Sequence, residues 1–338
     1  MAFYVRDADP IADERAIDEL ASTHFELHNP QRFRWLYKEN PFGSARVWLA
    51  LERETETPVG MAAMFPRKAF VNGNEVSAAV LGDFCISERF RSLGPAVQLQ
   101  KACLSPVKSG EIAFCYDYPS SRMLAIYKYL GLVPSDQSFR FVKFLKAEAA
   151  IGRKSVHSLA KPFLPLGTAL LRLGEPQPLA SDKNEYRLEQ EPDASEYQAL
   201  ADKIGSSQGD CTARTATYLN WRFRQHPSEQ YEFLAAYRGG ELQGYCIFKV
   251  SGESAQLTDM LSMPQADTTK GLLFHLLRIL RGRGASTVSV AALASDPRVP
   301  LLRKFGFWGR ESVPVIRYSA GRDNLGARLL LMQGDRES

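Results

Sequence analysis

The order of apolar and polar positions in the first 146 residues predicts two helices followed by a strand-rich region. Ile17, Leu20 and His24 recur at helical spacing, and residues 30–40 continue in a second helical stretch. Further along, apolar runs predict strands at 47–52, 59–71, 77–87, 111–116 and 138–145, with helices at 95–107 and 120–130. The turn Asn72-Gly73-Asn74 joins two of these strands. This element order predicts an α+β fold with a mixed, mostly antiparallel twisted sheet flanked by helices.

The second half of the chain repeats features of the first half in the same order. The pattern W-x-aromatic-basic-x-x-P occurs at Trp35 and again at Trp221. The segment LGDFCIS (81–87) aligns with LTDMLSM (257–263), and YKYLGL (127–132) aligns with LRKFGF (302–307). The repeat predicts tandem domains at 1–146 and 186–338, joined by a connector at 147–185 with a short helix near 166–173. The alternative is two unrelated α+β domains that share common glycine and aromatic positions.

Composition narrows the class of protein. The chain has 338 residues, is 45% hydrophobic and 24% charged, and has a formal net charge of +4. This balance excludes a disordered chain and gives no reason to expect a nucleic-acid partner. The five cysteines form no CxxC pair, so we expect buried thiols and no metal site. We expect a cytoplasmic protein without stable membrane insertion, because no secretory signal is recognisable and charged and proline residues interrupt the most apolar stretch, 159–173.

The segment DFCISERFRSLGPAVQLQKACL (83–104) carries the strongest chemical signal. A predicted strand ends near Ile86, a short basic loop follows, and a helix begins near Pro95. Such a junction presents backbone N–H groups and the positive end of a helix dipole to an anion. Gly94 would let a phosphate approach the backbone, and Arg91 would add positive charge. The alternative is an ordinary strand–loop–helix turn with solvated arginines.

This segment resembles motif A of the GNAT superfamily, the acyl-CoA-dependent N-acyltransferases. Ile86, Arg91, Gly94 and Ala96 stand at the positions and spacing of that motif. Residues 118–132 resemble the family's motif B helix, in which Tyr127 precedes a glycine by four residues. The resemblance covers residues 1–146 well and 186–320 weakly. It implies an N-acyltransferase, in particular an acetyltransferase, that uses acetyl-CoA or another acyl-CoA as co-substrate.

The resemblance also implies roles for individual residues. The CoA pyrophosphate is expected at Arg91, Ser92, Leu93, Gly94 and Ala96, and the pantetheine arm along Phe84, Cys85 and Ile86. Ser120 replaces an asparagine that often contacts this arm. Tyr127 is expected to protonate the leaving thiolate, and Asp83 to deprotonate the amine.

Each catalytic assignment has a structural alternative. Tyr127 could be a core aromatic residue, and Asp83 could hydrogen-bond to a neighbouring loop. Cys85 is expected to pack rather than to form a covalent intermediate, because no histidine partner is identifiable. Pro95 departs from the family pattern by removing one N–H from the loop, although proline suits a first helical turn.

The second half lacks the phosphate loop. Its corresponding stretch reads SMPQADTTKGLLFHLL (262–277), and Leu302 stands in the place of Tyr127. We therefore expect this half to build the side that binds a primary amine acceptor, which attacks the thioester directly. Two other functions stay open: an aminoacyl-tRNA-dependent transferase of the Fem type, and a catalytically silent acyl-CoA-binding module.

Overall fold

The computed structural model describes residues 3–9, 11–26, 28–151, 164–180, 182–205, 210–263, 266–321 and 329–336. Its first half contains β1 (Phe3–Asp7), α1 (Glu14–His24), α2 (Pro30–Phe33), η1 (Arg34–Lys38), β2 (Arg46–Glu52), β3 (Pro58–Val71), β4 (Asn74–Ile86), η2 (Glu88–Phe90), α3 (Leu93–Cys103), α4 (Ser105–Lys108), β5 (Phe114–Asp117), α5 (Ser121–Tyr129) and β6 (Asp136–Phe144).

The connector carries α6 (Ala147–Ile151) and α7 (Leu164–Leu170). The second half contains β7 (Glu185–Glu189), α8 (Ala194–Gly205), β8 (Asp210–Thr212), α9 (Ala216–Leu219), η5 (Asn220–Arg224), β9 (Glu232–Arg238), β10 (Glu241–Ser251), β11 (Ser254–Ser262), α10 (Ala266–Gly282), β12 (Thr287–Leu293), α11 (Val299–Lys304), β13 (Trp308–Tyr318), β14 (Leu329–Leu330) and η6 (Gln333–Asp335).

One sheet runs through both halves in the order β1-β2-β3-β4-β5-β13-β6-β12-β11-β10-β9-β7. Its centre is an exchange of strands: β13 from the second half pairs with β5, and β6 from the first half pairs with β12. Most neighbours are antiparallel, and along this order each half contains one parallel pair, β4 with β5 and β11 with β12; β14 also pairs in parallel with β8 beside it. The α+β expectation is confirmed. The predicted domain boundaries therefore separate two segments of the sequence, but one sheet contains strands from both segments.

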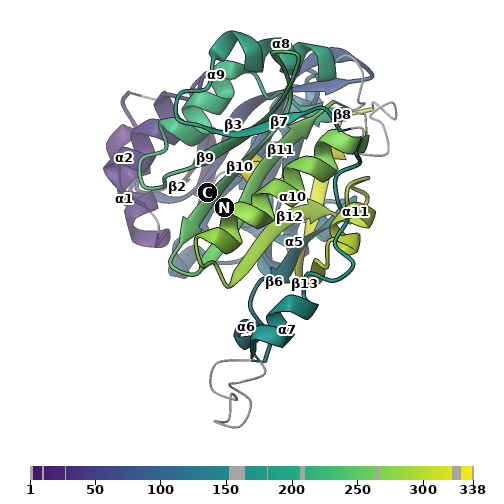
Figure 1. Cartoon of the computed structure of the whole chain (residues 1–338). Coiled ribbons are helices and arrows are strands. Elements are labelled where there is room, and N and C mark those ends of the chain that lie inside the picture. The colour runs from purple at the N-terminus through teal and green to yellow at the C-terminus, as the bar shows by residue number, and fades with distance from the viewer. Residues whose placement is uncertain are drawn as a thin grey trace.

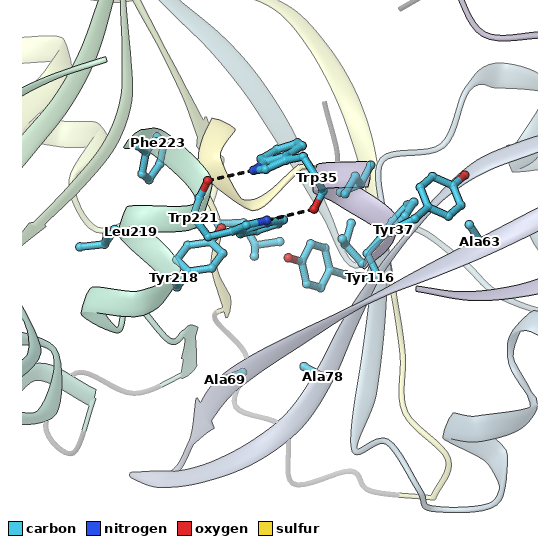
Figure 2. Close-up of a cluster of buried hydrophobic side chains, with 14 of the residues drawn as sticks. Trp35, Tyr37, Ala63, Ala69, Ala78, Tyr116, Tyr218, Leu219, Trp221 and Phe223 are labelled. Atoms are coloured by element: carbon cyan, nitrogen blue, oxygen red, sulfur yellow. Dashed lines mark hydrogen bonds between the residues drawn. The ribbon is translucent and has the colours of Figure 1, made fainter. Parts of the chain in front are cut away.

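The repeated tryptophan motif joins the two halves at their centre. Trp35 and Trp221 stack with ring centroids 4.7 Å apart, and each indole N–H donates to the other residue's carbonyl oxygen, at 2.9 and 3.1 Å (Figure 2). Arg222 lies over the Trp35 ring and Arg67 over the Trp221 ring, which extends the stack on both sides. Both tryptophans lie in π-helical turns, η1 and η5; the sequence pattern predicted a helix around Trp35 and made no such prediction around Trp221.

Helices cover both faces of the sheet, and α10 lies across the strands of the second half (Figure 1). Leucines at helical spacing bury one face of α10 against these strands. The connector helices α6 and α7 lie beyond the end of β6 (Figure 1). The carboxylate of Glu175, after α7, forms ion pairs with Lys143 of β6 and with Arg281 of α10. These ion pairs attach the connector to the sheet. The predicted connector helix is confirmed at Leu164–Leu170, two residues earlier than expected.

Candidate active site

The parallel pair β4–β5 opens into a gap at one end of the sheet. β5 pairs with β4 from Ala78 to Val80 and then ends at Asp117, whereas β4 continues to Ile86. The edge of β4 beyond Val80 therefore has no strand partner on that side among the described residues. A cavity of about 300 Å³ lies at this opening, lined by His24, Phe25, Phe84, Cys85, Ile86, Arg91, Ser92, Ala96, Ser120, Arg122, Met123 and Ile126. Seven of the predicted site residues are brought together here.

A β-bulge marks β4 where the gap opens. The pairing of β4 with β3 shifts register between Met61 and Ala63, so that Asp83 and Phe84 are both accommodated opposite a single residue. Asp83 has a φ of +45°, a left-handed conformation that is uncommon for a residue other than glycine. The bulge turns the end of β4, and hence Phe84 and Cys85, toward the cavity that they line.

The loop after β4 uses some of its amides internally. Arg91 N–H donates to the Glu88 carbonyl, and Ser92 N–H donates to the Phe90 carbonyl at 2.8 Å. The N–H groups of Leu93 and Gly94 begin α3 and make no hydrogen bond among the described residues, as expected for the first turn of a helix. Of the groups expected to bind a diphosphate, the N–H groups of Leu93 and Gly94 and the side chain of Arg91 therefore stay available.

Gly94 keeps the space in front of those donors open. A Cβ atom built on Gly94 would meet no atom within 4 Å. Arg91 is half-exposed and makes only a long ion pair, 3.5 Å, with Glu88. The positive end of α3, an open backbone and a half-exposed guanidinium meet at one end of the cavity, which is the arrangement that an anionic diphosphate needs.

Tyr127 lies on α5 with its hydroxyl buried beside the point where β4 and β5 part. The hydroxyl donates to Asp117 at 2.6 Å and accepts from Gln100 at 3.1 Å. Burial, and then the charge of Asp117, raise the pKa of Tyr127 well above its ordinary value, so the phenol keeps its proton at neutral pH. Its neighbour Ile126 lines the cavity, whereas Tyr127 itself does not. The catalytic role of Tyr127 stays a prediction.

Asp83 is held by two partners from the first-half helices. Its carboxylate accepts a hydrogen bond from the Tyr37 hydroxyl at 2.7 Å and pairs with Arg32 at 3.3 Å. Burial and this carboxylate raise the pKa of Tyr37 well above its ordinary value. Asp83 does not line the cavity between β4 and β5. Its role as a base also stays a prediction, because the structural alternative, a hydrogen bond to a neighbouring segment, describes the contacts it makes.

Cys85 and Ser120 make different contacts in the cavity wall. Burial raises the pKa of Cys85 to about 12, so its thiol is protonated at neutral pH and packs in the cavity wall. Ser120 caps α5 by accepting a hydrogen bond from the Met123 N–H at 3.3 Å. That capping role leaves its O–H available to the cavity that Ser120 lines. No group of His, Cys, Asp and Glu that could hold a metal ion is found among the described residues.

The second half has the same gap, with a cavity of about 310 Å³ at the end of β11 and an arginine in the cavity wall. β11 pairs in parallel with β12 only as far as Leu257 and then continues to Ser262. Arg298 lies in this gap, where it donates to the Met260 carbonyl at 2.7 Å and pairs with buried Asp296 at 2.6 Å. The guanidinium thus takes a main-chain acceptor on the edge of β11, at the place that corresponds to Phe84 of β4.

Another cavity, of about 320 Å³, lies between the two halves, and we call it the inter-half cavity. It is lined by Glu26, His28, Asn29, Arg32, Trp35, Arg222, His226, Ser228, Glu229, Tyr231, Lys249, Gln256, Thr258 and Gln333. Nothing in the sequence predicted a role for His28, because one histidine without a motif carries little signal. A third cavity, about 490 Å³, lies beside α1 and β2 and contains none of the predicted site residues.

Comparison with solved structures places this geometry among known folds. A protein of unknown function from Enterococcus faecalis, described as a probable N-acyltransferase, superposes with a TM-score of 0.68 at 12% identity, over 96% of this chain and 74% of its own. The chain has the GNAT fold. A GCN5-related N-acetyltransferase from Anabaena variabilis gives a TM-score of 0.66 at 12% identity, covering 93% of this chain and 72% of that one.

The GNAT fold extends to an enzyme with a longer acyl donor. N-myristoyltransferase from Saccharomyces cerevisiae, solved with bound myristoyl-CoA, gives a TM-score of 0.57 at 11% identity over 94% of this chain and 82% of its own. No protein-family profile and no curated protein sequence matches the chain. Among the described residues, helices of the length and apolarity needed to cross a bilayer are absent.

Proposed function

We propose that this protein transfers an acyl group from acyl-CoA, with acetyl-CoA as the first candidate, to a primary amine. The observation that carries the proposal is one cavity that the open edge of β4, the half-exposed Arg91 and Ser92 line together. Leu93 and Gly94 do not line this cavity, but they follow Ser92 at the start of α3, and their amides make no hydrogen bond among the described residues. The fold that the chain shares with N-acetyltransferases supports this reading.

In the proposed complex the diphosphate binds at the Leu93 and Gly94 amides and at Arg91. The pantetheine arm then follows the edge of β4 along Phe84, Cys85 and Ile86, with Ser120 opposite. An extended arm with amide groups can pair with a strand edge in the way that a further strand would. The thioester would thereby reach the bulge in β4, near the join of the two halves.

The chemistry that follows needs an amine without its extra proton and a thiolate that gains one. Tyr127 is our candidate for the second task, since its raised pKa keeps the phenol protonated. To act, its hydroxyl must exchange the hydrogen bond to Asp117 for one to the sulfur. Asp83 is the candidate base from the resemblance, and it would have to act from within its contacts to Arg32 and Tyr37.

We further propose that the chain consists of two GNAT-like units of which only the first binds acyl-CoA. The position of Arg298 supports this division of labour, because its guanidinium already uses the Met260 carbonyl on the edge of β11. The second unit would instead supply the wall of the inter-half cavity opposite α2, where the acceptor is expected.

Calorimetric titration with acetyl-CoA tests the proposal. Charge reversal in Arg91→Glu should weaken binding about 10- to 100-fold, because charge-assisted hydrogen bonds contribute about 1.5–3 kcal/mol each. The matched control is Arg89→Glu, since Arg89 belongs to the same loop, is 80% exposed and pairs with Glu52. Equal affinity of the two variants would contradict the assigned site. Binding without turnover of any amine would leave the silent acyl-CoA-binding module, and acylation that requires aminoacyl-tRNA would favour the Fem-type transferase.

A further inference from the structure

His28 has an unused hydrogen-bonding atom in the wall of the inter-half cavity. Its side chain is only 4% exposed, and its Nε2 lies 2.8 Å from Asp18 Oδ1. The other ring nitrogen, Nδ1, is buried and has no hydrogen-bond partner among the described residues. A buried nitrogen without a partner is costly for a fold, and it indicates that a bound molecule supplies the missing contact.

The contact with Asp18 determines what Nδ1 can do. A carboxylate accepts hydrogen bonds, so we assign the ring proton to Nε2, which leaves a lone pair on Nδ1. The Phe33 ring meets the imidazole edge-on, with centroids 6.0 Å apart, and fixes its orientation. A histidine that a carboxylate orients, in the wall of a cavity and with its second nitrogen unpartnered, is the arrangement of a general base. The partner that this nitrogen takes is an N–H donor.

The inter-half cavity adjoins the proposed acyl-CoA cavity through two links. His24 and Phe25 line the acyl-CoA cavity, and Glu26 and His28, a few residues along the same segment, line the inter-half cavity. Arg32 lines the inter-half cavity and pairs with Asp83, whose neighbour Phe84 lines the acyl-CoA cavity. A molecule in the inter-half cavity therefore lies next to the end of β4.

The second half supplies an argument about Asp83. Its counterpart Asp259 pairs with Arg214 at 3.0 Å and accepts a hydrogen bond from Tyr245 at 3.2 Å, as Asp83 pairs with Arg32 and Tyr37. The second half carries no phosphate loop, and still holds its aspartate with an arginine and a tyrosine. Such contacts therefore occur as a structural feature, which leaves the proton transfer to another group.

We propose that the inter-half cavity binds a small primary amine in its ammonium form and that His28 is the general base. This inference rests on the proposed N-acyltransferase function. Three cations also line the cavity, but Arg32 pairs with Asp83, Lys249 pairs with Glu229, and Arg222 donates to the Gly334 carbonyl. The carboxylate of Glu26, exposed and without a partner among the described residues, is therefore the group that can pair with an ammonium. Asp18 is a positioning residue, because it acts through His28.

The proton balance of the step is complete. The ammonium gives one proton to His28 Nδ1 and becomes the nucleophilic amine. The C–N bond forms as the C–S bond of the thioester breaks. The second proton that the nitrogen loses ends on the CoA sulfur, and the imidazolium returns its proton to solvent, so that amide, CoA thiol and one proton are the products.

The test uses the full chain, acetyl-CoA and three primary amines (putrescine, tyramine and glycinamide), with release of free CoA thiol as the readout. For the amine that reacts fastest, His28→Gln should lower kcat/KM about 100-fold. The Kd for acetyl-CoA, measured by calorimetry, should stay within about twofold. Asp18→Asn should lower kcat about tenfold, and Asp18→Glu should restore most of it.

Three comparisons separate the possible results. His275→Gln is the matched control, since His275 stacks on Tyr186 away from both cavities. His28→Ala should regain activity when imidazole is added, which a purely structural histidine would not show. Unchanged kcat/KM in His28→Gln, together with a large loss in Asp83→Asn, would overturn the role of His28 and leave the transferase standing. Absence of turnover in the unaltered protein, despite acetyl-CoA binding, would overturn the transferase and this inference with it.

Discussion

The two gaps in the sheet begin from the same geometry and end differently. In each half a central strand pairs in parallel with its neighbour over a few residues and then continues alone, β4 beyond Val80 and β11 beyond Leu257. A cavity of about 300 Å³ lies at the end of β4 and one of about 310 Å³ at the end of β11, but at β11 Arg298, paired with Asp296, uses the Met260 carbonyl. The fold supplies an opening in both halves, and in the second half an arginine side chain takes a main-chain acceptor at its edge.

The difference also shows how a buried strand edge is satisfied. A strand edge presents carbonyl and N–H groups that need partners. Arg298 provides one by donating to the Met260 carbonyl. In the first half the corresponding groups face a cavity, so the partner must come from water or from a ligand. The four predictions that follow test this contrast, and the size of the expected effect decreases from one to the next.

Replacement of Arg298, the arginine at the edge of β11, should have the largest effect. Arg298→Ala leaves the buried carboxylate of Asp296 and the Met260 carbonyl without their partner, which should lower the free energy of unfolding by about 3–5 kcal/mol. Urea denaturation measures this change. The control Arg303→Ala, an exposed arginine on the following helix, should change stability by less than about 0.5 kcal/mol. Asp296→Asn combined with Arg298→Gln should recover at least half of the loss, and a loss as large as that of Arg298→Ala would argue against charge as its cause.

Closure of the first gap should abolish ligand binding while the fold survives. Gly94→Val places methyl groups in open space at the start of α3, where no atom lies within 4 Å, on the residue that carries one of the two proposed main-chain donors. We expect acetyl-CoA affinity to fall about 100-fold, because the diphosphate loses its approach to the backbone. Gly282→Val is the control, since a Cβ there also meets nothing within 4 Å and lies near the end of α10. A normal Kd for Gly94→Val would place the diphosphate elsewhere.

Tyr127 is a chemical difference between the two halves, because Leu302 stands at the corresponding position of the second half. Tyr127→Phe removes the proposed acid and should lower kcat about 10- to 100-fold with little change in the KM for acetyl-CoA. The variant also loses the bond to Asp117, so its unfolding curve must be recorded beside the kinetics. Tyr129→Phe, on the same helix and 65% exposed, is the reference. Loss of stability without loss of kcat would assign Tyr127 to the core.

The smallest effect concerns His226 at the joint between the halves. Burial, and then the nearby Arg222 guanidinium, lower the pKa of His226 to about 4. Since its ordinary pKa is about 6.5, the unfolded chain binds more protons between these values, and stability decreases as the pH falls through this window. When the pH falls from 6.5 to 4.5, the free energy of unfolding of His226→Gln should therefore decrease by about 1–2 kcal/mol less than that of the unaltered protein. Thermal unfolding across this range measures the difference, and parallel curves would show that His226 is not responsible.

The candidate site was predictable from sequence where local pattern carries the chemistry. The run from Phe84 to Ala96 combines a strand end, a basic loop and a glycine at a helix start, and each of these is a property of neighbouring residues. The structure brings both ends of this run, Phe84 to Ile86 and Arg91, Ser92 and Ala96, into one cavity. By contrast, the internal hydrogen bonds of the Arg91 and Ser92 amides, and the inward hydroxyl of Tyr127, depend on how the loop folds and on residues far away.

Other features were missed because no local signal reports them. β1 is short and lacks alternation, and η1 and η5 differ from ordinary helices only in their hydrogen bonding. His28 acquires its meaning from Asp18 on α1 and from a cavity wall that the second half completes. Arg298 could not be distinguished in sequence from an arginine in solvent.

The amino-acid sequence by itself determined the order of the elements, the α+β class and the internal repeat, because hydrophobic periodicity and turn residues act over a few positions. Only the tertiary structure decided that β6 and β13 exchange places, so that the two halves share one sheet. It also decided which strand edge an arginine occupies and which histidines line a cavity. Those outcomes depend on long-range pairing and on the burial of charge, where residues distant in the chain compete for the same hydrogen-bonding groups.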